Sequence, residues 1–167
     1  RANKTQEALE AIDKAVELNP EMPEAFLLKA TTYFMSNYLE EAMKALDRTL
    51  EIKPDYPEAF AIKSEILQSQ GKMEEALEYV HKGLDINDSL PTLYYTLSKL
   101  KKFTKDDPAL KKMIELGSQS EKHGKTQTPS IYYALFKAHE DIGDYKKSFE
   151  YLKKGADTFR SSIFYNP

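Results

Sequence analysis

The feature that most constrains this 167-residue sequence is a period of 34 residues. Residues 23–56 are followed by residues 57–90, which carry similar residue types at the same places. The matching pairs are Phe26 and Phe60, Ala30 and Ser64, Ala42 and Ala76, and Ile52 and Ile86. A period of this length predicts stacked helix pairs, because one pair cannot bury its apolar face alone and neighbouring pairs must cover it.

Apolar periodicity and turn residues predict where the helices lie. Helices are expected at 5–18, 23–36, 39–52, 57–70, 73–86, 92–103, 108–121, 130–142 and 145–159. Asn37 and Gly71 are expected to form tight turns between paired helices, as is the Gly143–Asp144 step. A polar break at 104–107 and a loop at 124–128 interrupt the later part of the chain.

Small residues are expected where helices cross closely, because the side chain at a crossing sets the distance between the two axes. These residues are Ala30, Ala42, Ser64, Ala76, Gly83 and Ser98. Phe136 takes the corresponding place in the last repeat, so we expect that junction to pack more widely.

The repeat register predicts one domain over residues 1–160. It contains a half repeat at 1–22, repeats at 23–56 and 57–90, an irregular unit at 91–128 and a repeat at 129–160. Because the half repeat lacks its first helix, we expect the sequence to be a fragment of a longer protein. Residues 161–167 would then begin a linker to a further C-terminal domain. Apolar surfaces at the two ends of the fragment could also pair with a second copy, which would give a dimer that depends on the boundaries of the fragment.

These repeats resemble the tetratricopeptide repeat (TPR), in which an aromatic residue, small residues and a closing proline recur; Pro20 and Pro54 occupy the proline place. The resemblance implies an all-α fold, a right-handed α-α superhelix of antiparallel helix pairs. It also implies a protein- or peptide-binding role, with a concave groove lined by the first helix of each repeat. The groove candidates are Leu27, Thr31, Phe34, Met35, Ala61, Glu65, Gln68, Tyr95, Lys99, Lys102, Tyr133 and Lys137. These places lack the Lys and Asn pattern of the repeats that clamp chaperone C-termini.

Composition excludes several other classes of protein. The sequence is 41% hydrophobic and 31% charged, and no apolar run approaches the ~20 residues of a membrane-spanning helix. It has no cysteine, which is consistent with a cytoplasmic location. We expect no catalytic, cofactor or metal site, because His81, His123 and His139 lack ligand partners at helical spacing. Nucleic acid is not an expected partner, since the pI is about 5.7.

Charge is distributed unevenly along the chain. Residues 1–90 hold 10 Lys/Arg against 18 Asp/Glu, a net charge of −8, while residues 91–167 hold 14 against 9, a net charge of +5. One interpretation is an ordinary solvated surface of varying sign. The alternative is a basic docking surface, which would consist of Lys99, Lys101, Lys102, Lys105, Lys111 and Lys112.

The last repeat supports a narrower resemblance. The run from Tyr133 to Arg160 is similar to the repeat that precedes the catalytic domain in bacterial TPR-sulfotransferases, although Phe136, Ser148 and Ala156 depart from that pattern. The resemblance implies the N-terminal interaction module of a sulfotransferase-like protein. The alternative is a free-standing scaffold that assembles a protein complex. We expect no enzyme activity in this fragment, because its six glycines form no phosphate-binding loop.

Overall fold

The computed structural model describes residues 2–123 and 128–162, and this part of the chain contains nine helices and no strand. The helices form two compact units, Arg1–Asn87 (unit 1) and Asp88–Pro167 (unit 2). An all-α fold was the prediction, and the structure confirms it. Each unit is described by itself below.

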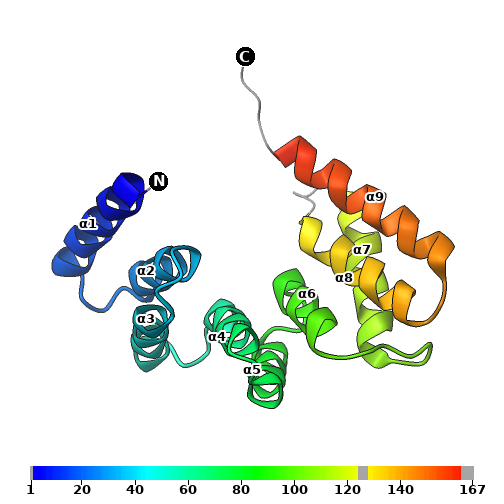
Figure 1. The fold of residues 1–167 in the computed structure, drawn as a ribbon, viewed down its shortest axis with the longest axis horizontal. Helices are drawn as coiled ribbons and strands as arrows, with labels where there is room; N and C mark the ends of the chain where they lie inside the picture. Colours follow the sequence, from blue (N-terminus) through cyan, green and yellow to red (C-terminus); the bar gives the residue numbers. More distant parts are fainter. Residues whose placement is uncertain (1, 124–127, 163–167) are drawn as a thin grey trace. The chain divides into compact units, whose positions relative to one another are not determined.

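Unit 1 is a stack of helix pairs that follows the 34-residue period. Its helices are α1 (Ala2–Leu18), α2 (Pro23–Met35), α3 (Leu39–Ile52), α4 (Pro57–Ser69) and α5 (Met73–Ile86). Helix α2 pairs with α3 and α4 pairs with α5, while α1 packs on α2 and α3 packs on α4 (Figure 1). The bounds of α3 and α5 equal the predicted ones, and α2 and α4 each end one residue earlier.

The same turn closes three helix pairs, two in unit 1 and one in unit 2. Asn37, Gly71 and Gly143 lie at the same repeat place and have φ angles of 64°, 79° and 76°. In each turn the next residue's N–H donates to the carbonyl five residues earlier, from Tyr38 to Tyr33 at 2.9 Å and from Lys72 to Leu67 at 3.0 Å. This is the Schellman arrangement, which requires a left-handed residue that glycine or asparagine tolerates.

The core of unit 1 forms where small side chains let the helices approach. Leu46 of α3 is 0% exposed and lies in a cluster with Ala30, Ala42, Ala59 and Ile66. The Ser64 hydroxyl donates to the Ala76 carbonyl at 2.7 Å, which joins α4 to α5 at a close crossing. All six of the predicted small residues are buried.

An ion pair repeats along unit 1 with the period of the sequence. Lys29 Nζ of α2 lies 2.6 Å from Asp13 Oδ1 of α1, and Lys63 Nζ of α4 lies 2.5 Å from Asp47 Oδ1 of α3. Each pair joins the second helix of one repeat to the first helix of the next. The sequence does not continue this series, since the next two places hold His81 and Leu97.

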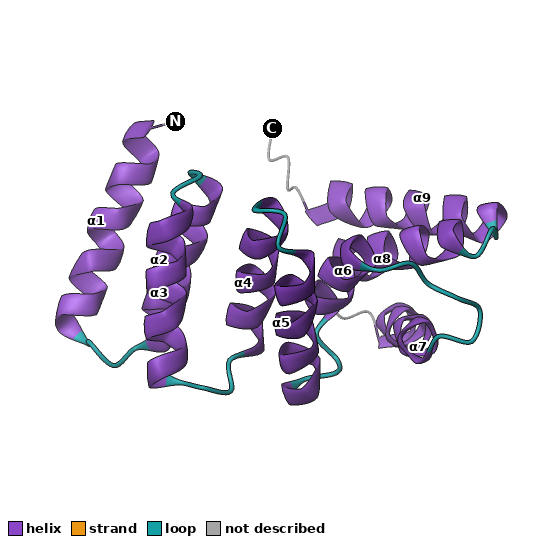
Figure 2. Cartoon of the chain, turned by 60° about the horizontal axis from the view of Figure 1, so that its bottom comes forward, coloured by secondary structure: helices purple, strands orange, loops and turns teal. Residues whose placement is uncertain are grey.

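Unit 2 is built around one central helix. Its helices are α6 (Pro91–Leu100), α7 (Pro108–His123), α8 (Pro129–Asp141) and α9 (Tyr145–Ser162). Helix α8 packs against α6, α7 and α9, and Figure 2 shows α7 nearly end-on while α8 and α9 lie across the view. The structure places Ser161 and Ser162, expected to begin the linker, within α9. The rest of that linker and residues 124–127 of the predicted loop lie outside the described residues.

Helix α6 ends three residues before its predicted end at Phe103, because Phe103 contributes to the core of unit 2 instead. Its side chain is buried, and its backbone N–H donates to Asp141 Oδ2 of α8 at 3.2 Å. Asp107 then caps α7 by accepting from the Ala109 N–H at 2.9 Å, and it pairs with Lys101 Nζ at 2.6 Å. The segment 101–107 is therefore a longer connection than the turns between the other helix pairs, and it includes a turn in which the Asp107 N–H donates to the Thr104 carbonyl at 3.2 Å.

A histidine lies buried beneath the turn between α8 and α9. His139 is 3% exposed, its ring centroid lies 5.2 Å from that of Tyr151, and neither ring nitrogen has a hydrogen-bond partner among the described residues. Its Nδ1 is 3.6 Å from Asp144 Oδ2, while Lys105 and Lys147 line the same surface hollow. Burial lowers the pKa of His139 below its usual 6.5; the Asp144 carboxylate opposes this shift and Lys147 adds to it.

This burial predicts a pH-dependent stability. Because the folded-state pKa lies below the unfolded value of 6.5, the unfolded chain binds the proton more readily. The free energy of unfolding is therefore at its full value above pH ~6.5, where His139 is neutral in both states. It decreases as the pH falls below that value. Replacing His139 with phenylalanine should remove this loss and raise the free energy of unfolding by roughly 1 kcal/mol, since no buried nitrogen is then left unpaired.

Urea denaturation at pH 5, 6 and 7 measures this effect. The exposed His81 provides the control, because His81→Phe should leave the pH dependence of the wild type intact. An unchanged pH dependence in His139→Phe would contradict the assignment.

Candidate functional site

A pocket of about 300 Å³ lies between α6 and α8 in unit 2. We call it the Tyr95–Tyr133 pocket; its lining residues are Tyr95, Ser98, Lys99, Tyr133, Phe136 and Lys137. Tyr95 and Lys99 are four residues apart on α6, as are Tyr133 and Lys137 on α8, so each helix presents a tyrosine and a lysine on one face. Four of the predicted groove residues therefore come together at one site.

The two tyrosines form the apolar walls of this pocket. Their ring centroids are 6.4 Å apart with an angle of 54° between the planes. The Tyr133 ring is held from behind by α9, where Gly155 comes so close that a Cβ added there would lie 3.0 Å from Tyr133 Cε1. Glycine at this place lets the helix backbone meet the ring directly, and the ring position depends on it.

The two lysines bring positive charge to the same aromatic surface. Lys99 Nζ lies 4.3 Å from the centroid of the Tyr95 ring, within cation–π range. Lys137 Nζ donates to Asp141 Oδ1 and lies 3.4 Å from Glu140 Oε2. The hydrogen bond to Asp141 is the largest influence that raises the pKa of Lys137, so its charge is fixed at neutral pH.

Asp141 links this pocket to the folded core of unit 2. Its side chain is buried, and its second oxygen accepts the Phe103 N–H described above. One carboxylate therefore holds both the end of α6 and the lysine at the rim of the pocket. Lys137 is positioned by a buried partner rather than by solvent, which reduces the conformational entropy that a ligand would have to restrict.

The residue types that line this pocket are suited to holding a ligand. Aromatic walls suit an apolar or aromatic side chain, and an ammonium group on each helix suits a carboxylate beside it. The described residues contain no group of three or more His, Cys, Asp or Glu side chains placed to hold a metal ion. Within the same residues, no helix has the length and hydropathy needed to cross a membrane.

The other predicted groove residues have more varied environments. On α2, Met35 is 82% exposed, whereas Leu27 and Phe34 pack against the core of unit 1. Thr31 is half-buried, and its hydroxyl donates to the Leu27 carbonyl at 2.9 Å. These side chains of α2 mainly cover their own unit, and Met35 is the one that presents a large apolar surface to solvent.

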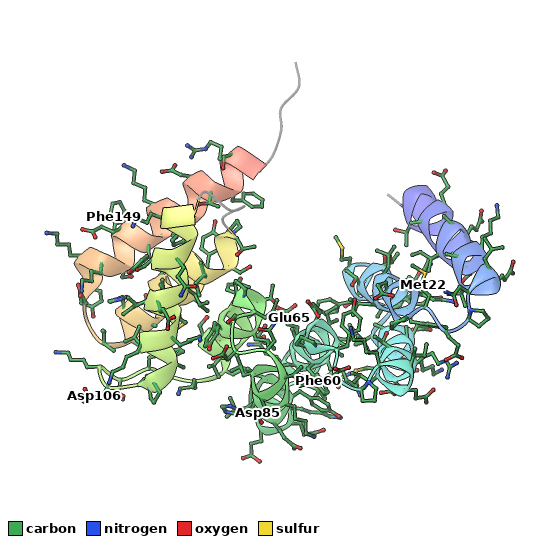
Figure 3. All side chains as sticks on the ribbon, turned by 180° about the vertical axis from the view of Figure 1, so that it is seen from behind. Met22, Phe60, Glu65, Asp85, Asp106 and Phe149 are labelled. Atoms are coloured by element: carbon green, nitrogen blue, oxygen red, sulfur yellow. The ribbon has the colours of Figure 1, made fainter. Side chains whose placement is uncertain are left out.

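The groove candidates on α4 and after α6 differ in exposure. Glu65, labelled on α4 in Figure 3, and Gln68 are half-buried. Ala61 differs from the expectation of an accessible groove residue, because its side chain is 6% exposed. Lys102 is exposed and follows the end of α6, outside the Tyr95–Tyr133 pocket.

Sequence reasoning did not include Ser98 and Phe136 among the candidates. Both occupy the small-residue place of their repeats, which was assigned to helix crossings. Ser98 is buried, whereas Phe136 is half-buried, and both line the pocket. The sequence could have indicated Phe136 as a pocket residue, because it is a large aromatic at a place that holds alanine or serine in the other repeats.

The proposed basic docking surface is partly neutralised by acidic neighbours. Lys101 pairs with Asp107, and Lys112 Nζ lies 2.8 Å from Asp88 Oδ2. The hydrogen bond to Lys112 is the main cause that lowers the pKa of Asp88. Lys112 thus contributes to the packing of α7 against the start of unit 2.

Comparisons with known proteins agree with this architecture. Residues 1–66 match the family described as tetratricopeptide repeat. A comparison with curated protein sequences gave no match.

Several solved structures are similar across nearly the whole chain. A crystal structure of MamA is 19% identical, covers 98% of this chain and 94% of its own, and has a TM-score of 0.58. TTC0263, a thermophilic TPR protein of Thermus thermophilus, is 17% identical with coverages of 94% and 84% and a TM-score of 0.64. YrrB, described as a TPR protein with an unusual peptide-binding site, is 19% identical with coverages of 94% and 79% and a TM-score of 0.54. The fold is thus that of TPR solenoids.

Proposed function

We propose that this chain is a non-catalytic binding module that holds a peptide or protein segment in the Tyr95–Tyr133 pocket. The observation that carries the proposal is the convergence of two tyrosines and two lysines, from the first helices of two consecutive repeats, on one hollow. A concave apolar surface with a few fixed polar groups is the usual form of a ligand site. The peptide-binding site named for the similar protein YrrB is in keeping with this role.

The pocket selects a ligand segment with two adjacent features. An aromatic or large aliphatic side chain would enter between Tyr95 and Tyr133, and a neighbouring carboxylate would meet Lys99 and Lys137. Lys137 Nζ already contacts Glu140 and Asp141, and Lys99 Nζ lies over the Tyr95 ring. Both ammonium groups would contribute to binding the carboxylate.

Selection from a random peptide display library tests this function. Peptides enriched on the full chain should carry an aromatic or aliphatic residue next to Asp or Glu. Their affinity should fall at least about tenfold in a Tyr95→Ala/Tyr133→Ala variant, since stacking and burial of an anchor side chain contribute about 1–3 kcal/mol. Helical circular dichroism should be unchanged, because both side chains are only half-buried.

Two single-site controls sharpen this experiment. Tyr38→Ala removes an exposed tyrosine of unit 1 and should leave peptide affinity unchanged. Lys99→Glu should weaken the acidic peptides, whereas Lys111→Glu on α7 makes the same charge change outside the pocket and should not. Equal affinity of the selected peptides for the wild type and the double tyrosine variant would refute the proposal.

The context of the module in a longer protein is a second, separate proposal. The run from Tyr133 to Arg160 favours the N-terminal interaction domain of a bacterial sulfotransferase-like protein, with the alternative of a free-standing cytoplasmic scaffold. None of the similar structures reported above is described as a sulfotransferase. Several residues of this run have packing roles, such as Gly155 behind Tyr133 and Asp141 at Phe103. The coding sequence beyond residue 167 decides between the two.

A further inference from the structure

The outer face of α9 exposes a stripe of apolar side chains. Phe149 is 68% exposed and Leu152 is 37% exposed, Ala156 continues the stripe at helical spacing, and the charged Lys153 lies on the same face. We call these four residues the α9 outer face; Phe149 is labelled in Figure 3. Within the described part of unit 2, α8 is the one helix that packs against α9. Large exposed apolar side chains in a row are typical of a surface that another element covers.

Unit 1 shows what covers this face in the same fold. The repeat register aligns the α9 outer face with Met43, Leu46, Asp47 and Leu50 of α3. On α3 this face is covered by α4, which places Ala59 and Ile66 in one cluster with Leu46 and reduces the exposure of Leu46 to 0%. The ion pair between Asp47 and Lys63 crosses the same junction. An antiparallel helix is thus the shape that fits this face.

Several charges on α9 are the reverse of those at the same places of α3, although Lys154 and Asp157 keep the signs of Arg48 and Glu51. Lys153 stands at the place of Asp47, the residue that receives Lys63 in unit 1. The first turn of α9 also carries Lys146 and Lys147, whereas the corresponding residues of α3 are Glu40 and Glu41. Cations at a helix N-terminus oppose the helix dipole; Lys147 Nζ lies 3.8 Å from Asp144 Oδ2, whereas Lys146 has no ion pair among the described residues. The reversal is complementary to an acidic partner.

We propose that the α9 outer face binds an amphipathic α-helix of a partner protein, placed as α4 lies on α3, with an acidic residue at the place that Lys63 occupies in α4. The apolar side of that helix would cover Phe149 and Leu152. Its acidic residue would pair with Lys153, and its C-terminal end would lie near Lys146, where cations are favourable. This surface is separate from the Tyr95–Tyr133 pocket, so each can be tested without the other.

The same charges disfavour the chain's own first helices from unit 1 as the occupant. Helices α2 and α4 carry Lys29 and Lys63 at the place that would face Lys153. Two like charges at that distance are repulsive, and repulsion of this kind is how interfaces reject wrong partners. The face thus accepts a helix of the shape of α4 but of opposite charge at one position.

A pair of synthetic helices tests the proposal with the full chain. The probe is a capped peptide of residues 57–71 carrying Lys63→Glu, and its reference is the same peptide with Lys63 kept. We expect the Lys63→Glu peptide to bind about three- to tenfold more tightly, because a repulsive pair becomes an attractive one. Chemical shift changes in NMR spectra of the labelled protein should map to Phe149, Leu152 and Lys153. A third peptide keeps Lys63 and reaches the same total charge through Gln68→Glu and Ser69→Glu; it should gain less affinity than the Lys63→Glu peptide, because Lys63 still faces Lys153.

Variants of the protein complete the test. Lys153→Asp should reverse the preference, so that the Lys63 peptide becomes the tighter ligand, while Lys111→Asp on α7 should leave it unchanged. Absence of binding by both peptides, or equal affinity for them, would overturn the proposal. So would sedimentation data showing that a second copy of the chain occupies the face and that a Phe149→Glu variant abolishes this association.

Discussion

Replacing Leu46 with alanine is expected to lower the free energy of unfolding of unit 1 by about 3 kcal/mol. Leu46 is fully buried at the junction of α2, α3 and α4, and its removal leaves a cavity among alanines that cannot fill it. The effect should appear in every helix of unit 1 that relies on this junction. Native-state hydrogen exchange of the α2, α3 and α4 amides measures it.

The control for Leu46→Ala is Leu28→Ala on α2. Leu28 is 55% exposed, so the same truncation should cost less than about 1 kcal/mol. Similar losses in the two variants would show that Leu46 does not occupy the centre of a tightly packed core.

Replacing Gly155 with valine is expected to disrupt the Tyr95–Tyr133 pocket from behind. Even the Cβ would lie 3.0 to 3.3 Å from three atoms of the Tyr133 ring, and the valine methyl groups would overlap it. Overpacking of this kind costs about 1–3 kcal/mol, whereas helix propensity alone would favour valine over glycine slightly. A net loss of stability is therefore attributable to the ring. Denaturant unfolding and the aromatic NMR signals of Tyr133 measure the two effects.

A double-mutant cycle isolates the contact between Gly155 and Tyr133. In a Tyr133→Ala background the valine has room, so Gly155→Val should cost at least about 1 kcal/mol less than in the wild type. Gly117→Ala on α7 is the comparison, because its Cβ would meet the end of the flexible Leu135 side chain, at 3.1 Å, rather than a ring. Additive effects of Gly155→Val and Tyr133→Ala would remove the basis for this support role.

The regular part of the fold could be predicted because several independent signals in the sequence indicate the same helices. In unit 1 the period, the prolines at the first helical turn and the turn residues Asn37 and Gly71 all indicate the same helix pairs. Unit 2 departs from this pattern at Lys105, which occupies the place of the left-handed turn residue. Lysine is less favourable in that conformation than glycine or asparagine, and the chain uses the longer connection 101–107 instead. The exact end of α6 depends on Phe103 and Asp141, a contact between distant residues that no local pattern reveals.

The candidate site was predicted in part, for a related reason. Tyr95, Lys99, Tyr133 and Lys137 follow from their repeat places, which stay on one face of a helix whatever the neighbours are. Phe136 was missed because its place normally packs against another helix. An exposed lysine on a helix does not by itself indicate an interface. The role proposed for Lys153 depends on the observed ion pair between Asp47 and Lys63, because Lys153 occupies the place of Asp47.

The position of α7 between α6 and α8 in the sequence bears on the order in which unit 2 is expected to assemble. Helices α8 and α9 are joined by a short turn, so their contacts form between near neighbours along the chain. Helix α6 instead packs on α8, and the whole of α7 lies between them in sequence. Closing that longer loop costs more chain entropy before any contact forms. We therefore expect the α8–α9 hairpin to form before α6 docks, and the Tyr95–Tyr133 pocket to be complete only after that docking.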